Sequence, residues 1–569
     1  MRKRWLVDES SVEIDIVNRL KNELNCPKFI AEFLVKKNIV SRDKANKFFY
    51  PKFMHLNDPF LFKDVKKAIN RILQAIENDE KILVYGDYDV DGTTATSILL
   101  LGLQELDANI EFYIPNRMIE GYGLSAEGNT TIIEREIDLV ITVDCGINAV
   151  EEVEELSKMG IDVIITDHHT PQKILPKAYA VLDPKLKGST YPYSELSGSG
   201  IAFKLLHALF LQRDKTGIEK YTDLAGFGTI ADIVPLNGEN RTLATLGIEQ
   251  MESRQNLGLK HLMKFCGLKT KSIKSSDVVF RLAPRINAAG RLSSADKAVK
   301  LMTSKYPEPA EFLARSIHME NQKRQQIDQT TFHRACDLID AKYDNLDDVY
   351  FIVLASEDWH PGVVGIVASK IVEKYNRPTI LITIDNGEGC GSGRSIRNFN
   401  IFKCLQHFKD DLISFGGHKY AAGLSILPEY IPKFEKEINE YAKAAISAED
   451  IKPQIRISSE LKLKTIDFEF IKWLKLLAPF GPSNMNPVFM SKNVKVIGYP
   501  YTVGTNHLKM KVGKANHILN LIGFNMGELA PSLKKGSAVD IAYSLEENVW
   551  KNKRRIQGKL KDIRPHNGY

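Results

Sequence analysis

Apolar and polar residues alternate in blocks along the first half of the chain, and these blocks predict a βαβα order. Short apolar runs that end in acidic or imidazole side chains occupy residues 81–92, 138–146 and 162–169. Helix-like patterns follow or separate them at 95–106, 125–135 and 148–159. Strands that alternate with helices form parallel sheets with right-handed crossovers. We therefore expect an α/β domain whose strand ends gather polar residues at the edge where such sheets bind ligands.

The acidic residues at these strand ends are expected to hold divalent cations. Asp87, Asp89 and Asp91 alternate along the chain, so an extended segment would point them to one side, where like charges repel unless a cation lies among them. The second run ends in Asp144, and the third ends in Asp167, His168 and His169. One such cluster alone is typical of a turn or a helix cap. Three clusters in register favour a metal site.

A fourth element, residues 221–236, carries Asp232 within an apolar stretch of small residues, where an unpaired carboxylate would be costly. Two interpretations are open: Asp232 caps a helix or pairs with Arg241, or it is a further metal ligand. Oxygen ligands with one or two imidazoles and no thiolate favour Mn²⁺ or Mg²⁺ over structural zinc. Two such ions, about 3.5–4 Å apart, would activate water and stabilise the leaving oxygen of a phosphoester.

The order and spacing of these motifs resemble those of the DHH phosphoesterases. The matching motifs are Gly-Asp-Tyr-Asp-Val-Asp-Gly at 86–92, Val-Asp-Cys-Gly at 143–146, Asp-His-His at 167–169 and Gly-Thr-Ile-Ala-Asp-Ile-Val-Pro-Leu at 228–236. Further motifs resemble the RecJ branch, at 239–241, 285–291, 391–395, 416–423 and 478–482. The resemblance covers nearly the whole chain. It implies a single-strand-specific 5′ to 3′ DNA exonuclease of DNA repair and recombination.

The resemblance also implies roles for single residues. It assigns the metal ions to Asp89, Asp91, Asp144, His168 and Asp232, with Asp144 as the bridging ligand and Asp87 as a further candidate. It places His169 at the scissile phosphate, so Asp144, His168 and His169 would carry the catalysis. The chain departs from many relatives in the wider superfamily at Tyr85, where they have a metal-binding His.

Residues 346–450 are expected to form a second α/β domain that binds phosphate. Strand-like runs at 349–355 and 378–384 flank a helix at 362–375. The Gly-Ser-Gly-Arg-Ser loop at 391–395 lets amides, hydroxyls and a guanidinium approach an anion. The family assigns the 5′-phosphate to Ser392, Arg394 and Arg285, and the nucleotide near the cut to His418. Arg291 could fill the place of Arg285, and the sequence does not decide between them.

A long helix and a basic carboxy-terminal region complete the predicted organisation. Residues 308–343 predict one helix of about 50 Å, and its polar middle at 318–326 indicates a solvent-bridging connector. Residues 451–569 contain 20 Lys and Arg against 8 Asp and Glu, so the positive charge is concentrated there. Short strand-like runs in this region predict a small β-barrel that resembles the oligonucleotide-binding (OB) domain of RecJ relatives.

This barrel is expected to bind single-stranded nucleic acid through phosphate charge and base stacking. The candidate residues are Lys509, Lys511, Lys553, Arg554 and Arg555, with Tyr501 and Trp550 for stacking. A basic face that serves only solubility is the alternative.

The length of 569 residues exceeds what one core supports, so we expect several domains. The expected parts are a helical segment at 1–80, the DHH domain at 81–305, the connecting helix at 306–345, the second domain at 346–450 and the barrel at 451–569. We expect residues 1–80 to pack beside the DHH domain. Six scattered cysteines indicate neither disulfides nor zinc. Without a signal-peptide core or an apolar run of membrane-spanning length, a cytoplasmic location is expected.

Two other functions remain open at this stage. A DHH phosphodiesterase of short oligoribonucleotides or cyclic dinucleotides would not need the basic terminal domain. A catalytically silent subunit of a replication assembly would have lost its acidic ligands. The partner expected from the family is single-stranded DNA, with a single-strand-binding protein and a helicase as protein partners. The chain is expected to act as a monomer and without a membrane.

Overall fold

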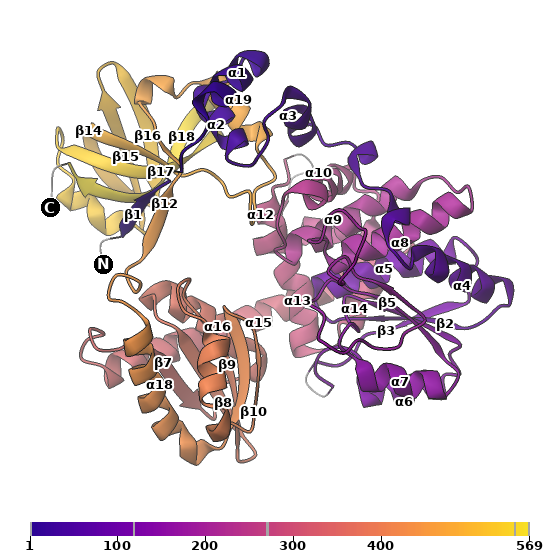
Figure 1. The fold of residues 1–569 in the computed structure, drawn as a ribbon. Helices are drawn as coiled ribbons and strands as arrows, with labels where there is room; N and C mark the ends of the chain where they lie inside the picture. Colours follow the sequence, from indigo (N-terminus) through magenta and orange to yellow (C-terminus); the bar gives the residue numbers. More distant parts are fainter. Residues whose placement is uncertain (1–2, 9, 118–119, 269–271, 551–552, 567–569) are drawn as a thin grey trace. The chain divides into compact units, whose positions relative to one another are not determined.

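The computed structural model describes residues 3–8, 10–117, 120–268, 272–550 and 553–566 (Figure 1). The chain divides into two units. The larger comprises Val7–His318 and Ile457–Tyr569, and the smaller comprises the chain up to Leu6 together with Met319–Arg456. Among the described residues, none of the helices combines the length and the apolar character needed to cross a membrane.

The centre of the larger unit is a parallel sheet, and this part of the prediction is confirmed. Its strands run in the order β3-β2-β4-β5-β6, with the bounds β2 (Ile82–Gly86), β3 (Ile110–Tyr113), β4 (Leu139–Val143), β5 (Asp162–Thr166) and β6 (Ala180–Leu182). The chain passes from β2 outward to the edge strand β3 and then returns to β4 on the other side of β2. The crevice between the ends of β2 and β4 is therefore the topological switch point, where sheets of this kind bind ligands.

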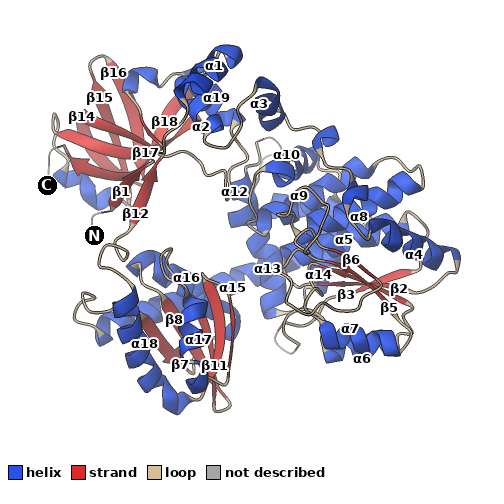
Figure 2. Ribbon diagram, in the orientation of Figure 1, coloured by secondary structure: helices blue, strands red, loops and turns tan. Residues whose placement is uncertain are grey.

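Helices cover both faces of this sheet (Figure 2), which explains why β2 and β4 are buried along their whole length. Ile82 and Val84 face a core with α4 (Val65–Glu77), α5 (Val90–Gln104) and α8 (Gly198–Gln212). Leu83 and Tyr85 face a second core with α6 (Ala126–Glu134) and α7 (Val150–Lys158). Alternate residues of one strand thus serve two apolar layers.

Further helices follow β6 and α8 in the larger unit. They are α9 (Thr222–Ala231), α10 (Gly238–Ser253), α11 (Leu257–Phe265), α12 (Ser275–Asp277), α13 (Ala283–Leu292) and α14 (Asp296–Met302). A π-helical turn, Val278–Leu282, leads directly into α13. The motif at 285–291 therefore lies on a helix.

The long helix α15 runs over Pro307–Lys342, which is about 54 Å at 1.5 Å per residue. Its middle differs from the expected helix with solvent on all sides, because Asn321 and Arg324 are buried. Arg324 donates to Asn321 Oδ1 at 3.1 Å, and its guanidinium lies 3.8 Å from Asp328. Asp328 in turn accepts from Lys370 of the helix α16 (Pro361–Tyr375) at 2.8 Å. A polar sequence was compatible with partial burial here because these side chains contact one another and Lys370.

The smaller unit contains a mixed sheet in the order β10-β11-β9-β8-β7, in which only β7 and β8 run parallel. Its strands are β7 (Ile352–Ser356), β8 (Thr379–Asp385), β9 (Glu388–Arg394), β10 (Ser414–Gly417) and β11 (Ala421–Ile426), and its helices are α16 (Pro361–Tyr375), α17 (Ile401–His407) and α18 (Ile431–Ala445). The predicted α/β layer is present. The Gly-Ser-Gly-Arg motif, expected in a loop, instead lies on the strand β9, which pairs with β8 and β11.

The carboxy-terminal part forms the predicted barrel. Its elements are β13 (Ser459–Glu460), α19 (Phe468–Leu476), β14 (Phe489–Val503), β15 (His507–Lys514), β16 (His517–Gly523), β17 (Ala538–Trp550) and β18 (Lys553–Pro565). The order β14-β15-β16-β18-β17 closes because β17 also pairs with β14. Closure removes the exposed sheet edges and creates an interior filled by apolar side chains.

The first helices of the chain lie against this barrel, not beside the parallel-sheet domain as expected. The helices α1 (Ile14–Leu24), α2 (Lys28–Val35) and α3 (Arg42–Phe49) share one apolar core with barrel strands. Phe29 lies edge-on to Phe489 at 4.9 Å between ring centroids. The later part, from Phe53 to α4, packs on the core of the parallel-sheet domain. A short strand, β1 (Arg4–Val7), pairs with β12 (Gln454–Ile457).

Candidate metal centre

The strand ends β2, β4 and β5 bring the predicted acidic residues together. Asp87 follows β2, Asp144 follows β4 and His168 lies just beyond β5. Asp89 caps α5 and accepts from the Gly92 amide at 3.1 Å. Asp144 has a φ of 61°, a left-handed conformation that Asp tolerates better than most residues and that turns its carboxylate away from the strand direction.

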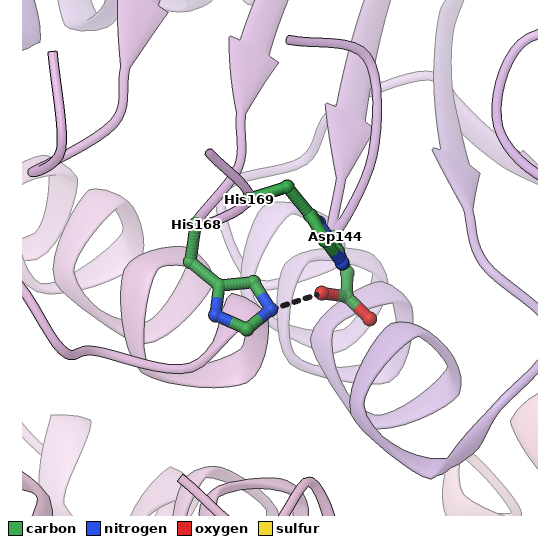
Figure 3. A group of neighbouring side chains, drawn as sticks. All are labelled: Asp144, His168 and His169. Carbon is green, nitrogen blue, oxygen red and sulfur yellow. Dashed lines mark ion pairs between the residues drawn. The ribbon is translucent and has the colours of Figure 1, made fainter. Parts of the chain in front are cut away.

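The imidazole of His168 lies among three carboxylates. Its Nε2 is 3.0 Å from Asp144 Oδ1 (Figure 3), 3.7 Å from Asp232 Oδ2 and 4.0 Å from Asp91 Oδ2. Burial lowers the pKa of His168 to about 4, although Asp91 opposes this, so the ring is neutral at pH 7. A neutral imidazole beside three carboxylates provides one nitrogen and several oxygen donors that a cation among them could bind.

Three groups of ligand atoms are close enough to hold ions, and one of them, formed by Asp144, His168 and His169, shares a residue with each of the other two. Within one group, the ligand atoms of Asp91, His168 and Asp232 lie within 4.8 Å of one another; the same holds for those of Asp87, Asp89 and Asp144. The contact between His168 and Asp144 joins the two groups. A pair of neighbouring divalent ions, with Asp144 between them, therefore fits the arrangement of donors.

The electrostatics of the carboxylates indicate the same need for cations. Burial, followed by repulsion from neighbouring carboxylates, raises the pKa of Asp87, Asp144 and Asp232 well above the ordinary value. Among the described residues, no hydrogen-bond donor reaches the buried Oδ1 atoms of Asp87 and Asp144. Carboxylates in such surroundings remain ionised at neutral pH only with a positive partner. Oxygen and imidazole donors without thiolate suit Mn²⁺ or Mg²⁺.

The start of helix α8 fixes Asp91. Its carboxylate accepts from the Gly198 amide at 2.6 Å and from the Ser199 amide at 3.0 Å. A Cβ on Gly198 would lie 2.6 Å from Asp144 Oδ1, so only glycine allows the helix to approach both carboxylates. The backbone of α8 thereby orients one candidate ligand without any side chain of its own.

Asp167 orients His169. It accepts from the amides of Ile147 and His168 at 3.0 and 2.7 Å, and from Nδ1 of His169 at 2.7 Å. Burial favours the neutral form of His169, but the hydrogen bond to Asp167 and the nearby carboxylates outweigh it and raise the pKa of the ring. The Tyr122 hydroxyl lies 2.9 Å from the Asp144 carbonyl and 3.0 Å from His169 Nδ1, so the ring is held from two sides.

Two alternatives from the sequence are resolved by these contacts. Arg241 does not pair with Asp232, because its guanidinium donates to main-chain carbonyls of residues 48 and 476–479. Tyr85 does not take the place of a metal-binding His. It is fully buried, and its hydroxyl donates to the Gly123 carbonyl at 3.0 Å.

The carboxylates open into a cavity of about 260 Å³. It is lined by Asp87, Tyr88, Asp89, Arg117, Tyr122, Asp144, His169, Asp232, Asn287, Gly290 and Arg291. The last three come from one face of α13, at i, i+3 and i+4. Arg285 points elsewhere: its Nε donates to His318 Nδ1 at 3.1 Å, and Nη1 donates to the Arg281 carbonyl. Of the two arginines between which the sequence could not choose, the cavity contains Arg291.

Sequence reasoning missed Arg117, Tyr122 and Asn287. Arg117 and Tyr122 lie in the loop after β3, a half-buried edge strand that we did not predict from the sequence. The Gly-Tyr-Gly sequence at 121–123, with φ of 83° at both glycines, was an available signal of a shaped loop. Asn287 could have been found from its spacing of four residues to Arg291 on a helix.

In the smaller unit, Ser392 and Arg394 lie on β9 beside the first turns of α16. Arg394 donates to Ser392 Oγ at 3.2 Å. A Cβ on Gly365 of α16 would lie 2.8 Å from Ser392 Oγ and 3.0 Å from Arg394 Nη2, so this glycine permits the close approach. His418 is exposed in the turn between β10 and β11, where its amide donates to the Ala421 carbonyl at 2.8 Å.

On the barrel, Lys509 and Lys511 are exposed on β15, and Lys509 is in register with the exposed Tyr501 of β14. Lys553 and Arg555 are exposed at the start of β18. Arg554 differs from them because its Nε donates to Glu547. The side chain of Trp550, the other predicted stacking residue, lies outside the described residues.

Three family models match the chain. Residues 81–229 match the DHH family N-terminal domain, residues 348–444 match the DHHA1 domain and residues 457–562 match the RecJ OB domain. These matches agree with the catalytic sheet, the smaller mixed sheet and the barrel.

Similar proteins match over almost the full length of the chain. The single-stranded-DNA-specific exonuclease RecJ of Bacillus subtilis is 40% identical over 565 residues, covering 99% of this chain and 71% of that protein. The protein of the same name from Haemophilus influenzae is 32% identical, with 88% and 90% covered. The crystal structure of RecJ in complex with Mn²⁺ from Thermus thermophilus superposes with a TM-score of 0.85 at 29% identity, covering 100% of this chain and 80% of that one.

Proposed function

The chain belongs to the RecJ family of DHH phosphoesterases, and on this premise we propose that it is a metal-dependent, single-stranded-DNA-specific exonuclease. It would hydrolyse phosphodiester bonds from the 5′ end of the strand, in DNA repair and recombination. The observation that carries the proposal is the convergence of six candidate ligands, Asp87, Asp89, Asp91, Asp144, His168 and Asp232. Four of them, Asp87, Asp89, Asp144 and Asp232, line one cavity.

Mn²⁺ or Mg²⁺ would be held in two neighbouring positions. Asp91, His168 and Asp232 supply donors for one position, Asp87 and Asp89 supply donors for the other, and Asp144 lies between the two. When bound, such ions activate water and neutralise the charge that develops on the scissile phosphate. The relatives support this choice, because the Thermus thermophilus RecJ was crystallised with Mn²⁺ and with Mg²⁺.

We assign His169 to the scissile phosphate. Asp167 occupies its Nδ1, which leaves Nε2 as the nitrogen available to donate to a phosphate oxygen. The raised pKa of the ring favours the protonated form that such a donor requires. Arg291 lines the same cavity, so we assign it, and not Arg285, to a phosphate of the strand near the cut.

The 5′-phosphate would be bound by Ser392 and Arg394, whose hydroxyl and guanidinium lie together beside α16, with His418 near the terminal nucleotide. On the barrel, Lys509, Lys511, Lys553 and Arg555 would contact phosphates of the single strand. Arg554 would contribute less, because Glu547 already neutralises it.

The proposed setting follows from the substrate. We place the protein in the cytoplasm as a monomer that acts on single-stranded DNA. A helicase that exposes the strand and a single-strand-binding protein that coats it are the partners whose action such an enzyme needs.

The test is digestion of end-labelled single-stranded DNA, duplex DNA and short RNA with Mn²⁺ or Mg²⁺. We expect metal-dependent release of nucleotides from the 5′ end of single-stranded DNA only. Asp144→Ala should lower the rate at least 10³-fold, because two ions lose their shared ligand. The control is Asp43→Ala, which removes an exposed carboxylate of helix α3 that is not part of the metal site and should leave the rate unchanged. Cleavage confined to short RNA would favour the oligoribonucleotide phosphodiesterase, and binding without cleavage would favour a silent subunit.

A further inference from the structure

The segment that carries Asp232 has a strained backbone. Helix α9 ends at Ala231, and residues 232–237, called here the Asp232 segment, connect it to α10. Ile233 has a φ of 62°, although a β-branched residue is an outlier in the left-handed region. Its side chain is 57% exposed, so packing of that side chain does not hold the conformation. A strained conformation persists only where the surroundings fix it from outside.

The contacts that fix the downstream end of this segment come partly from the carboxy-terminal domain. The Leu236 amide donates to the Pro482 carbonyl at 2.8 Å. Leu236 is buried against Gly481, where an added Cβ would come within 2.6 Å of Leu236 Cδ1. The neighbouring Pro235 carbonyl accepts from Asn240 Nδ2 at 3.1 Å and from the Tyr193 hydroxyl at 3.2 Å.

Gly481 and Pro482 belong to residues 477–484, called here the joint loop. Arg241 holds this loop in place. The buried guanidinium of Arg241 donates to the carbonyls of Leu476, Leu477, Ala478 and Pro479, at distances from 2.6 to 3.4 Å. Among the described residues, no carboxylate forms an ion pair with it. The Ser275 hydroxyl donates to the Phe480 carbonyl, and Asn484 Nδ2 donates to the carbonyls of Leu477 and Pro479 at 2.8 Å.

Two motifs that have no part in the chemistry thus meet at residues 235 and 236, just downstream of the candidate metal ligand Asp232. Asn240 and Arg241 belong to the motif at 239–241, and the joint loop contains the motif at 478–482. Asn240 binds the Asp232 segment directly, Arg241 binds the joint loop, and the joint loop binds Leu236. Leu236 is four residues from Asp232, whose carboxylate lies 3.7 Å from His168 Nε2.

We propose that the joint loop of the carboxy-terminal domain positions Asp232 for metal binding. Gly481, Pro482 and Arg241 are positioning residues: they touch neither metal nor substrate, and they act by holding the Asp232 segment in its strained conformation. The barrel domain consequently contributes to the metal centre as well as to the binding of DNA. This inference rests on the proposed function, since it concerns the ligands of the same metal site.

The test measures Mn²⁺ binding to the full chain by calorimetric titration in the absence of DNA. Gly481→Val places a branched side chain against Leu236 and should displace the Asp232 segment. We expect Mn²⁺ affinity to fall by about tenfold, the lower end of what loss of an outer-shell contact costs a metal site. Met485→Val adds the same side chain at an exposed position just beyond the joint loop, and its Mn²⁺ affinity should equal that of the unmodified chain.

A double-mutant cycle separates positioning of Asp232 from a general disturbance. With Asp232→Asn in place, Gly481→Val should change Mn²⁺ affinity less than about twofold, because the residue through which it acts is already removed. An equal loss in both backgrounds would overturn the proposal, and so would unchanged affinity in a folded Gly481→Val chain.

Folding is monitored by circular dichroism and thermal unfolding in EDTA. Should Gly481→Val fail to fold, Arg241→Lys goes through the same titrations, because lysine keeps the charge but cannot reach four carbonyls. Mn²⁺ binding without DNA also keeps the two proposals separable. A chain that binds Mn²⁺ through Asp232 but leaves single-stranded DNA intact would reject the exonuclease function and leave the positioning role standing.

Discussion

At the scale of the residue, two aspartates at equivalent strand ends have pKa values shifted in opposite directions. Asp144 and Asp167 are both buried, but hydrogen bonds decide between them. Asp167 accepts several hydrogen bonds, and these lower its pKa in spite of burial. Burial and neighbouring carboxylates raise the pKa of Asp144. Asp167 is therefore suited to orient His169, and Asp144 is suited to bind a cation.

Asp167→Asn tests this division of roles. Asparagine has one acceptor oxygen and no negative charge, so it cannot accept the hydrogen bonds from two backbone amides and from His169 Nδ1 as the carboxylate does. His169 should therefore lose its fixed orientation. We expect kcat on single-stranded DNA to fall by about 10- to 100-fold, as outer-shell losses do, whereas Mn²⁺ affinity changes little. Steady-state kinetics and Mn²⁺ titration measure the two effects. A loss confined to Mn²⁺ affinity would instead make Asp167 a ligand.

At the scale of the element, pairing within a hairpin decides which charges remain available. The hairpin of β17 and β18 brings Arg554 next to Glu547, and Lys475 from α19 donates to the same carboxylate. From the sequence alone, Arg554 was predicted to bind nucleic acid together with Lys553 and Arg555. The register Val549–Arg554, which places Glu547 within reach, is a property of the folded hairpin.

The Glu547 contacts predict a pH dependence of stability. Hydrogen bonds from Arg554 and Lys475 lower the pKa of Glu547 from 4.5 to about 2. Because the folded pKa is depressed, the stabilisation is complete above about pH 5 and is lost as the pH falls toward 2. Glu547→Gln should lower the free energy of unfolding at pH 7 by up to about 1 kcal/mol, since both cationic partners are exposed and screened by solvent.

Urea unfolding at pH 7 and pH 3 measures this effect, with Glu528→Gln as the exposed control in the same domain. The gap in stability between the unmodified chain and Glu547→Gln should narrow at pH 3. A gap of the same size at both pH values would mean that the ionisation of Glu547 has no part in the stabilisation.

At the scale of the whole molecule, the beginning and the end of the chain form one core. Phe29 contacts Phe489 at 4.9 Å and Phe470 at 6.2 Å between ring centroids, and the three residues are buried. The apolar stripes of the first helices were visible in the sequence. The surface that covers them belongs to residues more than 400 positions away, which no local pattern indicates.

Phe29→Ala tests this shared core. Removing a buried aromatic ring leaves a cavity and should cost about 3–5 kcal/mol of stability. We expect the chemical unfolding midpoint to fall and single-stranded-DNA affinity to weaken, because the barrel loses its packed support. Phe312→Ala, at a ring that is 71% exposed, is the control and should leave both quantities unchanged. An unaltered unfolding curve for Phe29→Ala would show that the barrel is stable without the first helices.

The sequence by itself determined the local elements and the ligand chemistry. Apolar strands that end in Asp87, Asp144 and His168 predict a parallel sheet and its functional edge, because strand direction and alternation are local properties. The closed barrel was predictable for the same reason. The basic residues and the motif with Arg285 and Arg291 were also apparent, but not the helix on which this motif lies, nor which arginine faces the cavity.

Only the tertiary structure decided the questions that depend on which surfaces meet. It turned Arg291 toward the carboxylates, buried the polar face of α15 and placed the first helices on the barrel. It also brought Pro482 to Leu236, next to the strained segment of a metal ligand. Contacts between residues distant in sequence result from complementary shapes of folded elements, whereas the pattern within one element records only which face is apolar.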